Sequence, residues 1–424
     1  MLKERLPPRT SAVFLFVAFL AVLILILILS RRFFFVPKIL MLLLVLLAVS
    51  AIGKVRLFLQ DWFVFISFIY LFDSFRGAIY IAICRLGLPV HTLCVIRAEQ
   101  FLFGGIPSVM LQNLFLQPVS GNEFGWFEKF ITVTYGTHFV AFILVGFIIW
   151  LHKPREFRFF KASFYLVIFL GLLGYFAIPT VPPWMASSVF GLLPRLIRFN
   201  AIIFNMAIPD ITSGFDTNPI AAMPSLHAAF PFLCALILWR VYRWKTWPFC
   251  LYMLLVLFAI VYTGDHYVVD VLAGIILGFL CYGAAVFLTR KDTQPESVFS
   301  GEKAGDAVAT KKMIRSIVVG LLILIAGIAI GSSNRSQFLR NPAAYNLYVP
   351  CYNDFFRHEE DFATNFQVQY YLGSHHFLKR DFDRAISYFE KCLVIARNEG
   401  EKQRAETGIK MSKEFRERAA HEIR

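Results

Sequence analysis

Long apolar runs constrain the fold of this chain more than any other feature of its sequence. An α-helix needs about 20 apolar residues to cross the hydrocarbon core of a bilayer, and several runs approach or exceed that length. Backbone polar groups find no water inside a membrane, so a spanning segment must satisfy them within a helix or a closed barrel. The sequence therefore predicts an all-α, polytopic membrane helix bundle with about nine spans. The runs are residues 13–29, 33–52, 62–86, 126–151, 162–179, 226–239, 249–263, 268–288 and 314–331.

The composition supports a membrane protein rather than several soluble domains. Of the 424 residues, 58% are hydrophobic and 17% are charged, whereas soluble domains are roughly 45–50% apolar and about 25% charged. The formal net charge of +14 is interpreted as basic loops that face anionic membrane lipids and the cytoplasm. A nucleic-acid partner would need a basic face on a soluble domain, and the sequence offers none.

Two short polar motifs stand at the ends of predicted spans. The first is Pro224-Ser225-Leu226-His227, and the second is Gly264-Asp265-His266-Tyr267-Val268-Val269-Asp270. If the flanking runs cross the bilayer, His227 and His266 lie at the same membrane face. Ionisable groups are costly there, and their presence indicates a functional site.

The spacing of these residues suits phosphoryl-transfer chemistry. His266 and Asp270 are four residues apart, so at the start of a helix they share one face. The carboxylate can accept the Nδ1 proton of the histidine and leave Nε2 more basic, and such a histidine can attack phosphorus. Ser225 is the expected N-cap of the next helix. His227 then lies in the first turn, where it can protonate a leaving alkoxide and deprotonate an incoming hydroxyl.

Two other interpretations of these residues stay open. Each residue is common singly at a membrane interface, so the group could be purely structural. Two histidines and one aspartate are also a chemically allowed zinc ligand set, although no further acceptors are evident near them in the sequence.

The two motifs resemble the second and third signatures of the type 2 phosphatidic acid phosphatase superfamily. More narrowly, they resemble its aureobasidin-resistance branch, the inositol phosphorylceramide synthases. Supporting matches are Pro182-Pro183-Trp184, Tyr135-Gly136…His138-Phe139 and Tyr262-Thr263, and the resemblance covers roughly residues 99–289.

The resemblance implies a six-helix membrane core whose site faces the lumen or the cell exterior. It implies His266 as the nucleophile, Asp270 as the residue that orients it, and His227 as the acid and base. The implied reaction moves a phospho-headgroup from a phospholipid such as phosphatidylinositol to a lipid hydroxyl such as that of ceramide. No metal and no organic cofactor is implied.

The sequence departs from the phosphatases at the residues that hold phosphate. Those enzymes carry an arginine six residues before the nucleophile, where this chain has Ile260, and an earlier Lys…Arg-Pro signature that is not evident here. The absence of these phosphate-holding residues favours a transferase that acts on a phosphodiester over a phosphatase that acts on a phosphate monoester. A lipid phosphate or pyrophosphate phosphatase with the same triad stays an alternative, as does a non-catalytic scaffold or transporter.

The oxyanion still needs cations, and the sequence does not choose among its arginines. Arg76 has neutralisation by Asp73, three residues earlier, as its alternative role, and His138 has a packing role as its alternative. The candidate substrate-binding residues are Ser225, Arg76, Arg97, Arg195, Arg198 and His138.

Basic loops set the predicted topology. Residues 152–161 and 240–245 are strongly basic and are expected on the cytoplasmic side, which places both motifs on the extracytoplasmic (periplasmic or luminal) face. Residues 89–125 are expected to form a surface or re-entrant segment that covers the site. The predicted divisions are an N-terminal transmembrane hairpin (1–60), a catalytic membrane core (61–290), a cytoplasmic linker (291–312), a further transmembrane helix (313–332) and an extracytoplasmic helical tail (333–424).

The tail has the composition of a soluble domain. Tyr371-Leu372-Gly373…Ala385…Phe389 loosely resembles one tetratricopeptide helix pair, although about three repeats are usually needed to bury a core. We expect either a small helical appendage that leans on the membrane core or a module that docks a protein partner. The His375-His376 pair is expected to be solvated.

Overall fold

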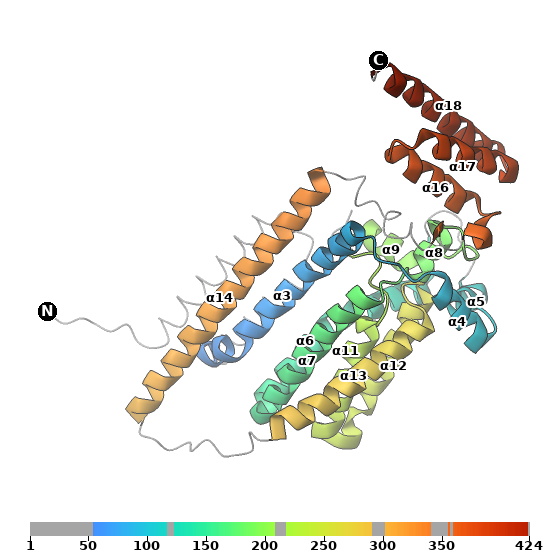
Figure 1. Cartoon of the computed structure of the whole chain (residues 1–424). Coiled ribbons are helices and arrows are strands. Elements are labelled where there is room, and N and C mark those ends of the chain that lie inside the picture. Colours follow the sequence, from blue (N-terminus) through green and yellow to red (C-terminus); the bar gives the residue numbers. More distant parts are fainter. Residues whose placement is uncertain are drawn as a thin grey trace.

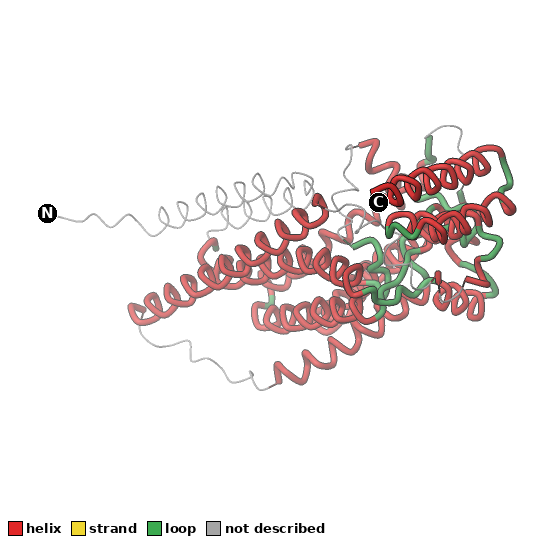
Figure 2. The backbone as a smooth tube through the Cα atoms, turned by 45° about the horizontal axis from the view of Figure 1, so that its top comes forward, coloured by secondary structure: helices red, strands yellow, loops and turns green. Residues whose placement is uncertain are grey.

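Helices account for nearly all of the regular structure in this computed structural model. The structure describes residues 54–116, 123–207, 218–290, 302–340, 355–356 and 359–422. Within these ranges it contains no strand, only isolated bridges that pair Thr180 with His91 and Ala221 (Figure 2). The predicted all-α class is confirmed. The predicted spans 13–29 and 33–52 lie outside the described residues.

Figure 1 shows how the helices are arranged. In chain order they are α3 (Val55–Leu86), α4 (Leu93–Phe103), α5 (Pro107–Phe115), α6 (Trp126–His152), α7 (Pro154–Ala177), α8 (Pro183–Ser188), α9 (Phe199–Ala207), α11 (Leu226–Tyr242), α12 (Trp247–Tyr262), α13 (Val268–Thr289), α14 (Glu302–Arg340), α16 (Phe366–Leu378), α17 (Phe382–Ile395) and α18 (Glu399–Glu422).

Among the residues that the structure describes, five helical stretches are long and apolar enough to cross a membrane, and the number rises to seven if two bent helix pairs count as spans. One bent pair is α4 with α5, which meet at 63° in the segment predicted to be superficial or re-entrant. The stretch Leu226–Tyr262 holds both α11 and α12, joined by a 3-10 turn at Arg243–Thr246. The chain is an integral membrane protein.

Small residues bring α13 against α11. A Cβ at Gly274 would collide with the carbonyl oxygen of Ser225, and one at Gly278 would come within 3.3 Å of the carbonyl oxygen of Ala229. Small residues allow this close backbone approach between membrane helices. The packing therefore sets the start of α11, with its first motif, directly beside the first turns of α13.

Outside the bundle, α14 packs along α3, and the two helices extend beyond their predicted limits. Helix α3 begins at Val55 because Asp61 has partners within the protein: the indole of Trp150 donates to its carboxylate at 2.9 Å. Helix α14 begins inside the predicted linker 291–312 and continues past residue 332. Hydropathy detects only the apolar middle of such a helix, since polar residues at its ends are compatible with a helix outside the hydrocarbon.

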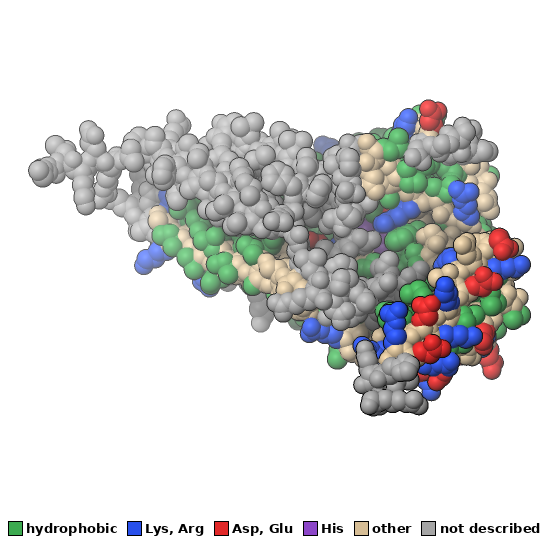
Figure 3. Space-filling view, turned by 90° about the horizontal axis from the view of Figure 1, so that it is seen from above, with side chains coloured by type: hydrophobic (Ala, Val, Ile, Leu, Met, Phe, Trp, Pro, Cys, Tyr) green, Lys and Arg blue, Asp and Glu red, His purple; other side chains and the backbone are tan. Residues whose placement is uncertain are grey.

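The C-terminal helices α16, α17 and α18 pack on one another at the end of the molecule where α8 and α9 lie (Figure 1). We call residues 355–356 and 359–422 the C-terminal domain. Seen from above, acidic and basic side chains intermingle at this end of the molecule (Figure 3).

The expectation that His375 and His376 are solvated is wrong. They are only 8% and 4% exposed, because the ring of His376 stacks on Tyr388 at 5.4 Å and its Nδ1 lies 3.3 Å from a carboxylate oxygen of Asp381. Both are therefore buried, and His376 packs against α17.

Acid should therefore destabilise the C-terminal domain. Burial lowers the pKa of His375 to about 4, and the charges of Lys379 and His376 act in the same direction. An unfolded histidine titrates near 6.5, so between about pH 6.5 and 4 the unfolded state binds more protons and stability falls as pH falls. Thermal unfolding of the full chain at pH 7.5 and pH 5 measures this. His375→Gln should lose less stability on acidification than the wild type, and an equal loss would contradict the assignment.

Candidate active site

The first motif forms the N-terminus of α11 as expected. The hydroxyl of Ser225 accepts a hydrogen bond from the backbone N–H of Ala228 at 3.3 Å, so it is the N-cap. The backbone N–H of Ser225 donates to the carbonyl oxygen of Asp270 at 3.0 Å. The cap thus places His227 in the first turn, and the backbone bond joins the two motifs directly.

The second motif is a tight turn between α12 and α13. Gly264 has a φ of +75°, a conformation that favours glycine. The turn closes when the N–H of His266 donates to the carbonyl oxygen of Ile260 at 3.1 Å. A carboxylate oxygen of Asp270 then accepts from the N–H of Tyr267 at 2.9 Å and caps α13. The position of the Asp270 side chain is therefore set by its structural role as a helix cap.

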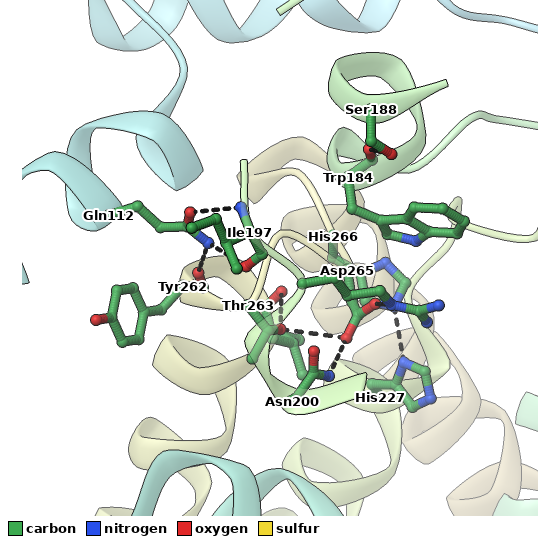
Figure 4. Close-up of polar contacts among 12 residues, drawn as sticks. Gln112, Trp184, Ser188, Ile197, Asn200, His227, Tyr262, Thr263, Asp265 and His266 are labelled. Carbon is green, nitrogen blue, oxygen red and sulfur yellow. Dashed lines mark hydrogen bonds and ion pairs between the residues drawn. The ribbon is translucent and has the colours of Figure 1, made fainter. Parts of the chain in front are cut away.

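The structure brings the three predicted catalytic residues together. Nδ1 of His227 lies 2.7 Å from Nε2 of His266 (Figure 4), and Nδ1 of His266 lies 3.5 Å from a carboxylate oxygen of Asp270. His266 and Asp270 are only 3% and 0% exposed. Nε2 of His266 therefore points at His227. A nucleophilic histidine with a second histidine as its acid and base requires this orientation.

The 3.5 Å separation between His266 and Asp270 is long for a hydrogen bond. Catalytic hydrogen bonds are often long without substrate and tighten once it binds. Among the residues that the structure describes, no group of three or more His, Cys, Asp or Glu side chains is arranged to hold a metal ion.

Asp270→Asn should lower kcat by roughly 10²- to 10⁴-fold without unfolding the protein. The amide oxygen can still accept the N–H of Tyr267 and cap α13. The same oxygen, Oδ2, faces Nδ1 of His266, but in a neutral amide it no longer raises the basicity of Nε2 or stabilises the positive charge that forms on the ring. Steady-state kinetics and a thermal unfolding curve measure both effects. Unchanged kcat would show that Asp270 only caps the helix.

Arg198 is the predicted arginine that reaches the second motif. Its Nε donates to Asp265 at 2.7 Å, and its guanidinium lies 4.5 Å from the ring centre of Trp184. Asp265 also accepts from Asn200 at 2.6 Å and from the hydroxyl of Thr263 at 3.2 Å (Figure 4). Since Asp265 directly precedes His266, this ion pair joins Arg198 to the turn that carries the predicted nucleophile, and a guanidinium has four N–H donors besides Nε.

The other candidate substrate-binding residues divide by location. His138 lies against His227, with ring centres 4.5 Å apart, and its Nδ1 is bonded to the carbonyl oxygen of Tyr135. Arg76 pairs with Asp73 at 3.7 Å. Two further arginines lie elsewhere: Arg97 pairs with Asp361 of the C-terminal domain at 3.1 Å, and Arg195 is exposed. Among the described residues, none of these three arginines contacts the triad.

Sequence reasoning missed two polar side chains of α4 and α5 that hold the site. A carboxylate oxygen of Glu99, which is 0% exposed, accepts from the N–H of Val269 at 2.9 Å. The amide of Gln112 donates to the carbonyl oxygens of Ile197 and Tyr262 and accepts from the N–H of Ile197, each at 2.9 Å. The predicted covering segment thus connects α12, α13 and the chain that leads to Arg198. Polar residues within an otherwise apolar segment were the only signal available.

Comparisons with known proteins agree with this geometry. Residues 96–284 match the model of the PAP2 superfamily. The chain is 29% identical over 184 residues to an inositol phosphorylceramide synthase catalytic subunit of Schizosaccharomyces pombe, a match over 40% of this chain and 43% of the relative. It is 31% identical over 156 residues to a phosphoinositol dihydroceramide synthase of Bacteroides thetaiotaomicron, over 33% of this chain and 50% of the relative.

The chain spans about half the length of these curated relatives. No solved structure matches it. The matched segment contains both motifs, the triad and Arg198. The resemblance drawn from the motifs is confirmed: residues 96–284 match the PAP2 superfamily model, and the chain is similar to relatives of its inositol phosphorylceramide synthase branch.

Proposed function

We propose that this protein is a membrane phosphotransferase that moves phosphoinositol from a phospholipid donor to the hydroxyl of a ceramide-like acceptor. The observation that carries the proposal is the His227–His266–Asp270 arrangement, with 2.7 Å between the two imidazoles and 3.5 Å to the carboxylate. The two relatives are both named as synthases of phosphoinositol-bearing ceramides, and these names suggest the headgroup and the acceptor class.

In the first half-reaction, Nε2 of His266 attacks the phosphorus of the donor. A nitrogen–phosphorus bond forms, and the bond from phosphorus to the glycerol oxygen breaks. His227 gives a proton to that oxygen, and diacylglycerol leaves. The donor phosphate must first replace the hydrogen bond between the two histidines, because the attacking nitrogen is the atom engaged in it.

In the second half-reaction, His227 acts as a base. It takes the proton of the acceptor hydroxyl, whose oxygen attacks phosphorus, and the bond to His266 breaks to restore the free enzyme. Arg198 donates a hydrogen bond to Asp265, the residue directly before His266. Its positive charge is the candidate that stabilises the charge developing on the phosphoryl oxygens in both steps.

We place the site on the extracytoplasmic face. Helix α11 begins at the site and ends at the basic 3-10 turn Arg243–Thr246, and α7 begins next to the basic residues around Lys153. Basic loops favour the cytoplasm, so the site belongs at the other face. In sealed cells, a membrane-impermeant thiol reagent should label an Arg195→Cys variant above the wild-type background. Labelling of Lys245→Cys instead would reverse the orientation.

The activity is tested with purified protein, headgroup-labelled phosphatidylinositol, and ceramide present or absent. A new labelled lipid that forms only with ceramide is the expected result. Release of soluble inositol phosphate or phosphate independent of ceramide would indicate the hydrolase, the alternative that the triad also permits. No turnover of any lipid by folded protein would favour the non-catalytic scaffold.

A further inference from the structure

The C-terminal domain contacts the membrane core at the chain that carries Arg198. We call residues 189–198 the Arg198 loop. The side-chain amide of Asn365 donates to the carbonyl oxygens of Phe190 at 3.1 Å and Gly191 at 3.2 Å. Its amide oxygen accepts from the N–H of Val368 at 3.1 Å and caps α16. One side chain thus joins the start of α16 to the Arg198 loop.

Apolar packing surrounds this polar contact. Phe190 meets Phe355 edge to face with ring centres 4.9 Å apart, and both are 0% exposed. The same buried cluster contains residues of the Arg198 loop, of α8 and of the C-terminal domain, including Leu193, Leu196 and Leu372. This cluster holds the two segments against each other, and the half-buried Asn365 makes its bonds at the edge of the cluster.

Short contacts connect the residues bound by Asn365, Phe190 and Gly191, to Arg198. The hydroxyl of Ser187 donates to the carbonyl oxygen of Pro194 at 2.8 Å and accepts from the N–H of Leu196 at 2.9 Å, so the loop is folded back on α8. The N–H of Trp184 donates to the carbonyl oxygen of Gly264 at 2.9 Å. The Arg198 loop is therefore held from the C-terminal domain on one side and from the catalytic turn on the other.

We propose that the C-terminal domain is a positioning element of the active site, and that Asn365 is the residue through which it fixes the Arg198 loop. The proposal rests on the proposed function, which gives Arg198 its role toward the phosphoryl group. The superfamily match ends at residue 284, so this element lies outside the part of the chain that the family accounts for. A tail that only docks a protein partner, the alternative from the sequence, requires no link between Asn365 and turnover.

Asn365→Asp isolates the contact. Aspartate is an equally good N-cap, so α16 is retained, but its carboxylate has no amide donor and faces two carbonyl oxygens. The expected result is a roughly tenfold lower kcat/KM and faster hydrogen exchange in residues 189–198. The variant should have little further effect in an Arg198→Lys background, because it acts through Arg198.

A matched control lies in the same domain. Arg416→Gln breaks the exposed ion pair of Arg416 with Asp383 (2.6 Å) without touching the Arg198 loop, and it should leave kcat/KM and loop exchange unchanged. The proposal is overturned if Asn365→Asp has wild-type turnover and wild-type loop exchange, or if it lowers turnover equally with and without Arg198. If the wild-type protein transfers no headgroup, the proposed function fails. Hydrogen exchange in residues 189–198 then still tests whether Asn365 fixes the Arg198 loop.

Discussion

Replacement of His266 with alanine should abolish headgroup transfer, lowering kcat by roughly 10³-fold or more, while the protein stays folded. The loss is large because Nε2 of His266 is the atom proposed to form the covalent bond, and no other described imidazole lies against Asp270. Folding should persist because the bonds that close the turn do not use the His266 side chain: the N–H of His266 donates to the carbonyl oxygen of Ile260, and the N–H of Tyr267 donates to the carboxylate of Asp270.

The measurement is kcat for labelled headgroup transfer, with size-exclusion and thermal unfolding profiles recorded in parallel. His152→Ala is the matched control, since His152 ends α6 and is exposed. It should retain wild-type kcat. A His266→Ala protein with normal turnover would contradict the role of His266 as the nucleophile.

Arg198→Lys should lower kcat by about 10²- to 10³-fold, although it keeps the positive charge. Lysine has no Nε–H to hold Asp265 and no planar group to lie over Trp184, whereas the arginine makes both contacts. The ammonium would therefore lose the contacts that fix the arginine at the turn before His266. The effect should fall on kcat more than on KM, since the charge matters most in the transition state.

Arg195→Lys is the control for this variant. Arg195 lies three residues earlier in the same loop but is exposed, without contact to the triad among the described residues. Its substitution should change kcat less than twofold. Equal losses in the two variants would mean that the loop as a whole, not the Arg198 guanidinium, supports turnover.

The bundle and the meeting of the two histidines follow from sequence pattern alone. Helices α11, α12 and α13 are apolar runs of nearly membrane-spanning length, and each motif sits at the end of such a run. Counting crossings brings His227 and His266 to one face, and the spacing of four residues brings Asp270 to the same site. The four-residue spacing is a local property and the number of crossings is a topological one, and a single sequence is enough to predict both.

The choice among the arginines could not be predicted. Arg195 and Arg198 are three residues apart in a stretch with no regular period, and the irregular path of the loop decides which one turns inward. That path depends on Gln112 and Asn365, which are far away in the sequence. For the same reason the roles of Glu99 and Asp265 appeared only with the fold, since their partners come from other segments.

The most direct test of the account is to trap the intermediate. Wild-type protein is mixed with phosphatidylinositol labelled in its phosphate, without an acceptor lipid, and quenched by denaturation. We expect an acid-labile, base-stable label on the protein that maps to His266 and disappears when ceramide is added before the quench. A wild-type protein that transfers the headgroup with no such label, or a His266→Ala protein that still carries it, would contradict covalent catalysis by His266.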